Sequence, residues 1–274
     1  MSKRAKFFAV SLFLGFLLWL SGFFGVEKRL AIVLSISGIA YVLSAWVLFE
    51  DLKGWEWITL LILPVLFTLG SGLFGNLLPS AIPSMFGLNF QIETSLFLGG
   101  VVRFVFIVLY VLGMYAVMLT ENIFSVASIR TIQLFRAARS VSFILALIVS
   151  LFFFAVVYSL RLPFYWISLV VGLVSLLLSF ESLWSVDLKT EHLDDVYRLS
   201  GIIGWLMALF AAVVAFWPIV PFMGGLVLTS CFYALLGILE QRLVNKMMAV
   251  NYGEFVIFNL IIVGIAFLTT SWRG

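Results

Sequence analysis

Residues 121–160 read ENIFSVASIRTIQLFRAARS followed by VSFILALIVSLFFFAVVYSL, a basic segment joined directly to an apolar one. The apolar half carries no charged residue and lacks the strict alternation of apolar and polar residues that a barrel strand shows. A helix of this length covers about 30 Å, which is the thickness of the hydrocarbon core of a bilayer. The segment therefore predicts a membrane-spanning helix that is preceded by a basic segment.

The whole chain is similarly rich in apolar residues. Hydrophobic residues make up 64% of it and charged residues 11%, against about 25% charged residues in soluble domains. A soluble fold could not cover such a composition with polar surface. We expect an all-α polytopic bundle, forming a single integral membrane domain over residues 1–274. Nine spans are predicted, at about 7–24, 30–49, 57–73, 95–119, 141–160, 163–184, 201–217, 222–239 and 255–271.

The first of these runs could be mistaken for a signal peptide, because it follows basic residues. It lacks a small-residue cleavage site and is followed by another span, so we interpret it as a retained helix. With the N-terminus in the cytoplasm, Lys and Arg collect on the cytoplasmic side, as the positive-inside rule requires. That side holds Lys3, Arg4, Lys6, Lys53, Arg130, Arg136, Arg139, Lys189, Arg198, Arg242 and Lys246, and the far side holds Lys28, Arg29, Arg161 and Arg273. We expect an integral protein of a bacterial inner (plasma) membrane.

Arg130, Arg136 and Arg139 belong to the basic segment and lie on one side of a helical projection. They predict an amphipathic helix at the cytoplasmic interface, where arginines bind anionic lipid headgroups. Docking of a protein partner is the alternative. Voltage sensing is disfavoured, because the three arginines lie outside the apolar stretch.

Arg103 is the one basic residue inside a predicted span, about 12 Å from its outer end. An ionisable residue in that position indicates either a functional site or a side chain that reaches the interface. The outer segment 70–93 is rich in Gly and Pro and contains Asn76, Pro79 and Pro83. Irregular backbone near the membrane is a feature of solute paths. The other interpretation is an external cap packed on the bundle.

Acidic residues are expected only in loops and at span ends, so we expect no carboxylate buried within the membrane. The loop 181–198 combines five carboxylates with His192, but the spacing matches no metal signature. We interpret it as a solvated docking surface. Net charge is only +3, which argues against nucleic acid as a partner. No catalytic, cofactor or metal site is predicted, since the sequence has no phosphate loop and no nucleophile with a suitable base.

Small residues recur every fourth position at Gly204, Ala208 and Ala212. Such a stripe lets two helices approach closely, and it favours packing inside the bundle. A homodimer interface is the alternative. Two functions stay open: a non-catalytic membrane subunit or scaffold that docks a partner through its cytoplasmic loops, and a small-solute or ion transporter or channel that uses Arg103 and the outer segment.

Overall fold

The computed structural model describes residues 3–49, 56–79, 81, 84–85, 88–89, 92–127, 133–186, 193–244 and 252–270. These residues form nine helices and one two-stranded antiparallel ribbon, in which Ser84 pairs with Asn89 and Met85 with Leu88. The all-α prediction is confirmed. The elements are α1 (Lys3–Ser21), α2 (Val26–Leu48), α3 (Glu56–Gly75), β1 (Ser84–Met85), β2 (Leu88–Asn89), α4 (Ile92–Ala127), α5 (Phe135–Ser159), α6 (Phe164–Trp184), α7 (Leu193–Val214), α8 (Pro221–Val244) and α9 (Tyr252–Thr269).

Eight of these helices are long and apolar enough to cross a membrane. The exception is α3, whose apolar part, Thr59–Gly75, is shorter than the others. Large apolar side chains also face outward along the helices, for example Phe104, Trp205 and Leu268. Such side chains are stable in contact with lipid and costly in contact with water. The length and composition of these helices indicate an integral membrane protein, while its inner-membrane location and its orientation stay predictions.

Internal packing divides the chain into two compact units. Unit 1 contains Met1–Glu50 and Pro64–Leu119, and unit 2 contains Asp51–Leu63 and Thr120–Gly274. Helices α3 and α4 each contribute residues to both units. The prediction of a single membrane domain stays a prediction, and we describe each unit by itself.

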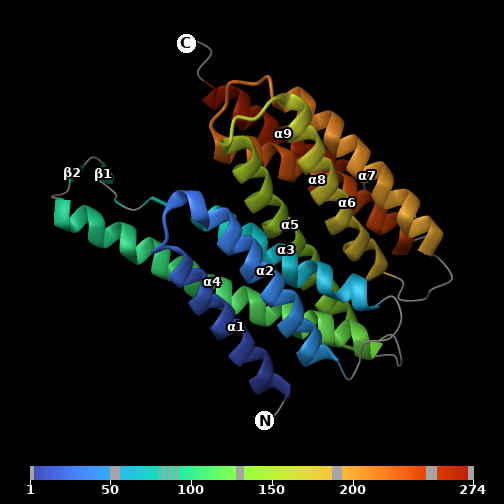
Figure 1. Ribbon diagram of the computed structural model, residues 1–274. Helices are drawn as coiled ribbons and strands as arrows, with labels where there is room; N and C mark the ends of the chain where they lie inside the picture. The colour runs from blue at the N-terminus through green and yellow to red at the C-terminus, as the bar shows by residue number, and fades with distance from the viewer. Residues whose placement is uncertain are drawn as a thin grey trace. The chain divides into compact units, whose positions relative to one another are not determined.

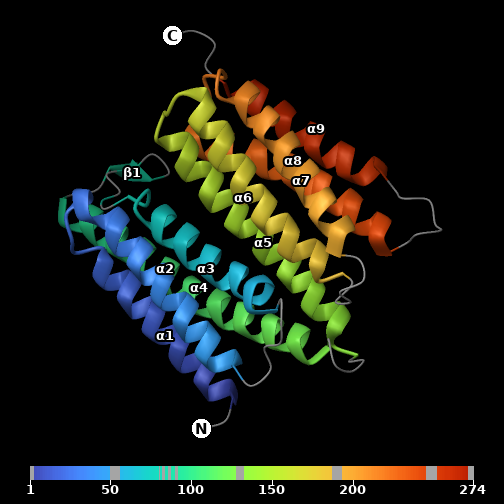
Figure 2. The same cartoon turned by 45° about the vertical axis from the view of Figure 1, so that its right-hand side comes forward.

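In unit 1, α1 and α2 form an antiparallel pair beside α3 and α4 (Figure 2). Glycines mark the closest approaches. A Cβ atom added to Gly15 of α1 would clash with the Val111 side chain of α4, and one added to Gly72 of α3 would lie 2.7 Å from Val33 of α2. Glycine at these positions lets the neighbouring side chains fill the space.

Unit 2 is a bundle in which α5, α6, α7, α8 and α9 lie side by side (Figures 1 and 2). Its most extensive interface is between α6 and α7. A Cβ atom added to Gly204 of α7 would lie 3.0 Å from the carbonyl oxygen of Gly172 in α6. A Cβ atom added to Gly172 would in turn lie 2.9 Å from Cβ of Ala208. Gly204 and Ala208 therefore pack inside the bundle, as the stripe of small residues predicts.

The predicted interfacial helix over 121–140 is divided between two longer helices. Its first residues continue α4 to Ala127, and its last residues begin α5 at Phe135. Helix α4 has 36 residues and is about 54 Å long, well beyond the length that a bilayer requires. Arg136 and Arg139 consequently belong to the first turns of a spanning helix rather than to a separate surface helix.

Candidate functional site

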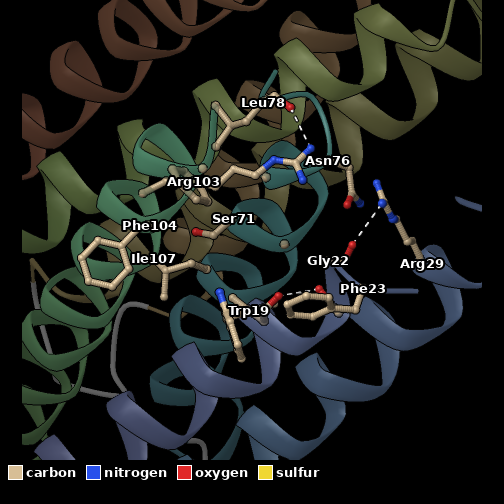
Figure 3. Close-up of a pocket in the computed structure, with 16 residues that line it drawn as sticks. Trp19, Gly22, Phe23, Arg29, Ser71, Asn76, Leu78, Arg103, Phe104 and Ile107 are labelled. Atoms are coloured by element: carbon tan, nitrogen blue, oxygen red, sulfur yellow. Dashed lines mark hydrogen bonds between the residues drawn. The ribbon is translucent and has the colours of Figure 1, made fainter. Parts of the chain in front are cut away.

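A pocket of about 310 Å³ lies in unit 1 between α1, the start of α2, the end of α3 and the first half of α4. Figure 3 shows its polar and apolar sides. In this view the guanidinium groups of Arg29 and Arg103 and the amide of Asn76 lie on one side. The side chains of Phe104 and Ile107 lie on the other. The pocket thus combines a basic end with an apolar wall.

Arg103 reaches the pocket from α4 and is half-buried. Its Nη2 atom donates a hydrogen bond to the backbone carbonyl of Leu78, 3.3 Å away, in the segment that follows α3. Its Nε atom is buried and has no hydrogen-bond partner among the described residues. Because a guanidinium has five N–H donors and this one has no carboxylate within ion-pair distance in the described chain, most of its capacity is available to an acceptor.

Arg29 comes from the first turn of α2 and holds the end of α1. Its Nε atom donates to the carbonyl of Phe24 at 2.9 Å, and its Nη2 atom donates to the carbonyl of Gly22 at 3.2 Å. Carbonyl groups just after a helix end have no partner within the helix, so a basic side chain there is stabilising. These bonds fix the position of the Arg29 guanidinium, whose remaining donors face no carboxylate in the described residues.

Ser71 adds a further polar atom to the pocket lining. It lies on α3 and is 1% exposed, and its Oγ atom has no hydrogen-bond partner among the described residues. Burial of an unpaired hydroxyl costs about 1–3 kcal/mol by mutational scales. Ser71 Oγ and Arg103 Nε are therefore two lining groups that a polar ligand could satisfy.

The pocket opens toward the lipid-facing surface of unit 1. Trp19 of α1 and Phe104 of α4 line it and are 45% and 64% exposed. Exposed rings at this position face hydrocarbon or the interface in a membrane-spanning helix. The pocket therefore has exposed aromatic rings among its apolar lining residues and two arginines at its basic end.

The structure describes the positions of three of the four predicted solute-path residues. Arg103 and Asn76 do line one pocket. Pro79 is exposed and is not among the lining residues. Pro83 lies outside the described residues. The proposed path thus retains two of its four residues in one site.

The basic segment has a different environment from the one predicted. Arg136 is exposed near the start of α5, whereas Arg139 Nε forms an ion pair with Glu240 Oε1 of α8 at 2.9 Å. Part of the hydrogen-bonding capacity of Arg139 is therefore taken up by an ion pair within unit 2. Arg130 lies outside the described residues, as does His192 of the loop 181–198.

Arg29 and Ser71 are two polar pocket residues that the sequence analysis did not select. Arg29 was assigned only to the outer loops. The predicted topology contained a stronger signal. The end of the first span and the starts of the second and fourth spans lie on the same predicted side of the membrane. Arg29 and Arg103 were therefore both expected near the outer interface. Ser71 gives no such signal, because serines occur throughout these helices.

The prediction that carboxylates lie in loops or at span ends did not foresee that two of them are buried by protein. Glu121 of α4 is 0% exposed and Glu181 of α6 is 1% exposed. Both lie near helix ends, as predicted, but neighbouring helices of unit 2 cover them. Glu181 therefore does not belong to a solvated docking loop. Helix ends can be buried by protein even where they lie close to the membrane surface.

Comparison with known proteins identifies a family. The family model described as "Protein of unknown function (DUF5656)" matches residues 15–269. The chain belongs to this family, whose description assigns no activity. Comparison with curated proteins and with solved structures gave no match.

Proposed function

We propose that this protein binds an anionic amphiphile of the phospholipid class in the Arg29–Arg103 pocket, as the substrate-binding step of a membrane transporter. The observation that carries the proposal is the buried Nε donor of Arg103, which has no acceptor among the described residues. It stands beside an apolar wall that continues to the lipid-facing surface. A phosphate oxygen is the acceptor that best fits a guanidinium.

The size of the pocket supports an occupant that is only partly enclosed. A volume of about 310 Å³ lies at the lower end of the range for small-molecule sites. It suffices for a phosphate-bearing headgroup and the first part of an acyl chain, with the rest of the chain left in the bilayer. A fully water-soluble anion would gain nothing from the exposed rings of Trp19 and Phe104.

The sequence alone favours the other function, a scaffold that docks a partner through cytoplasmic loops, but the described residues give it weaker support. It requires the basic segment to be available at the surface. Arg139, however, is paired with Glu240, and Glu181 is buried. Arg136 is the exposed member of the set among the described residues, and a single arginine provides little specificity.

The proposal predicts selective retention of anionic lipid. Purified protein in detergent would be mixed with phosphatidylglycerol, with phosphatidylcholine or with inorganic phosphate, and bound molecules would be counted by native mass spectrometry. We expect phosphatidylglycerol to bind and the other two to bind at least about tenfold more weakly. Replacement of either arginine, Arg103→Gln or Arg29→Gln, should weaken phosphatidylglycerol binding by about tenfold or more, because a charged hydrogen bond contributes about 1.5–3 kcal/mol.

Lys28→Gln is the matched control, because Lys28 is exposed, precedes Arg29 directly and does not line the pocket. It should leave lipid binding unchanged. Equal losses in the Lys28 and Arg29 variants would assign the effect to surface charge in general. Equal binding of phosphatidylglycerol and phosphatidylcholine by the unaltered protein would contradict the anionic class.

A further inference from the structure

The hydroxyl group of Ser71 has no role in the proposed function, although it lines the same pocket. Serine hydroxyls in helices commonly donate to a carbonyl group of the preceding turn. Ser11 of α1 and Ser37 of α2 do so, at 2.9 Å and 2.8 Å. Ser71 Oγ, by contrast, is buried without a hydrogen-bond partner among the described residues. The pocket therefore contains an unused hydroxyl donor.

Contacts between α3 and α4 fix the level of Ser71 within unit 1. After Ser71 in the chain, a Cβ atom added to Gly75 would lie 3.3 Å from Phe106 Cε1. Before Ser71, the Oγ1 atom of Thr68 lies 2.9 Å from the hydroxyl oxygen of Tyr110. Because Ser71 lies between Thr68 and Gly75 along α3, it lies at the level of the stretch of α4 from Phe106 to Tyr110.

Ser71 consequently lies further along the helices than the basic end of the pocket. A pocket residue of α4 at this level is Ile107, which follows Arg103 by one turn, or about 6 Å. The Arg103 guanidinium extends the other way, to the carbonyl of Leu78 beyond the end of α3. In Figure 3 the Ser71 hydroxyl points away from Asn76, toward the side where Ile107 lies. The donors are therefore arranged in order along the pocket, first the guanidinium and then the hydroxyl.

A phospholipid carries its acceptor groups in the same order. Its phosphate is followed, toward the acyl chains, by the ester carbonyl groups, whereas the rest of the headgroup lies on the other side of the phosphate. With the phosphate at Arg103, an ester carbonyl is the group that comes to the level of Ser71, and its oxygen accepts a hydrogen bond from a hydroxyl group. An ether-linked lipid lacks this carbonyl oxygen. A site built around a hydrogen bond discriminates against a ligand without the matching group.

We propose that Ser71 is a specificity-determining residue of this pocket. Its hydroxyl group donates a hydrogen bond to an ester carbonyl of the bound lipid, and it thereby selects ester-linked over ether-linked phospholipids. The inference rests on the proposed function, because it requires the phosphate to lie at the arginines. Arg103 contributes to the binding of any anionic phospholipid, whereas Ser71 determines the difference in affinity between the two linkages.

Two phosphatidylglycerols with chains of equal length test the proposal, one with both chains attached by esters and one with both attached by ethers. Each would be titrated into purified full-length protein in detergent, and its affinity would be measured by native mass spectrometry. We expect the diester to bind the unaltered protein about three- to tenfold more tightly than the diether, which is the effect of one additional hydrogen bond. Equal affinities would overturn the inference and leave the proposed function intact.

Ser71→Ala should remove this preference. The variant should bind the diester about as weakly as the unaltered protein binds the diether, and its affinity for the diether should not change. Arg103→Gln should instead weaken the binding of both lipids by the same factor and keep the preference. If Ser71→Ala retains the preference, or weakens the binding of both lipids equally, Ser71 does not bind the ester carbonyl and the inference is overturned.

Ser44→Ala is the matched control. Ser44 of α2 is also buried, and its hydroxyl also has no hydrogen-bond partner in the described part of the chain, but it does not line the pocket. This variant should bind both lipids as the unaltered protein does, and a loss of the preference here would overturn the inference. If the unaltered protein binds neither phosphatidylglycerol, the proposed function is contradicted and this inference falls with it.

Discussion

Glycine and arginine occur in both units, but their surroundings differ between the two. At the α6–α7 interface of unit 2, Gly204 is required because Leu176 and the Gly172 carbonyl leave no room for a side chain. In the pocket of unit 1, Gly100 has nothing within 4 Å of an added Cβ atom. Arginine differs in the same way, since Arg139 is paired with Glu240, whereas Arg103 has no carboxylate partner in the described chain. The α6–α7 interface is closely packed, whereas the pocket of unit 1 has room for an occupant.

Gly204→Leu should give the largest change in stability. The added Cβ atom would lie 2.9 Å from Leu176 Cβ and 3.0 Å from the Gly172 oxygen, so the helices must separate. Overpacking of this kind costs about 1–3 kcal/mol and occasionally more. We expect a lower melting temperature and a lower yield of monodisperse protein in detergent.

Gly201→Leu is the control on the same helix, because an added Cβ atom at Gly201 meets nothing within 4 Å. It should melt close to the unaltered protein. If the two variants melt at the same temperature, the α6–α7 interface is not closely packed, and the contrast with the pocket disappears.

Arg139→Gln should have the next largest effect. It leaves Glu240, whose side chain is 13% exposed, without its ion-pair partner. Loss of a charged hydrogen-bond partner by a largely buried group costs about 2 kcal/mol. Arg136→Gln removes an exposed arginine from the same turn and should change the free energy of unfolding by less than about 0.5 kcal/mol. Equal effects in chemical denaturation would mean that the Arg139–Glu240 pair does not hold α5 against α8.

The sequence predicted the helices much better than the sites, and the reason is physical. Each apolar run must satisfy its own backbone groups in lipid, so length and hydropathy alone locate a helix such as α5. Hydropathy does not tell which side of a helix faces lipid and which faces protein, because both environments are apolar. The burial of Glu121 and Glu181 depends on that difference.

The pocket residues also show that a single sequence does not reveal how the helices pack. Arg103 was selected because it interrupts an apolar run. Arg29 was not, because its place at a helix start is ordinary for a basic residue near a membrane interface. Whether Arg29 lies near Arg103 depends on how α1, α2 and α4 pack in unit 1. That packing cannot be inferred from a single sequence.

Gly100→Leu should have the smallest effect on stability and still weaken ligand binding. Gly100 lines the pocket, and space is open where its side chain would be. Leucine is also favoured over glycine within a helix, by roughly 0.5–1 kcal/mol. We therefore expect an unchanged or slightly higher melting temperature, together with weaker binding of phosphatidylglycerol in native mass spectrometry, because the leucine side chain occupies part of the pocket.

Gly38→Leu separates the two effects of that substitution. Gly38 is also exposed within a helix, an added Cβ atom meets nothing within 4 Å, and the residue does not line the pocket. It should match Gly100→Leu in stability and match the unaltered protein in lipid binding. If Gly100→Leu retains phosphatidylglycerol as well as Gly38→Leu does, the lipid binds elsewhere, and the open region of unit 1 needs another explanation.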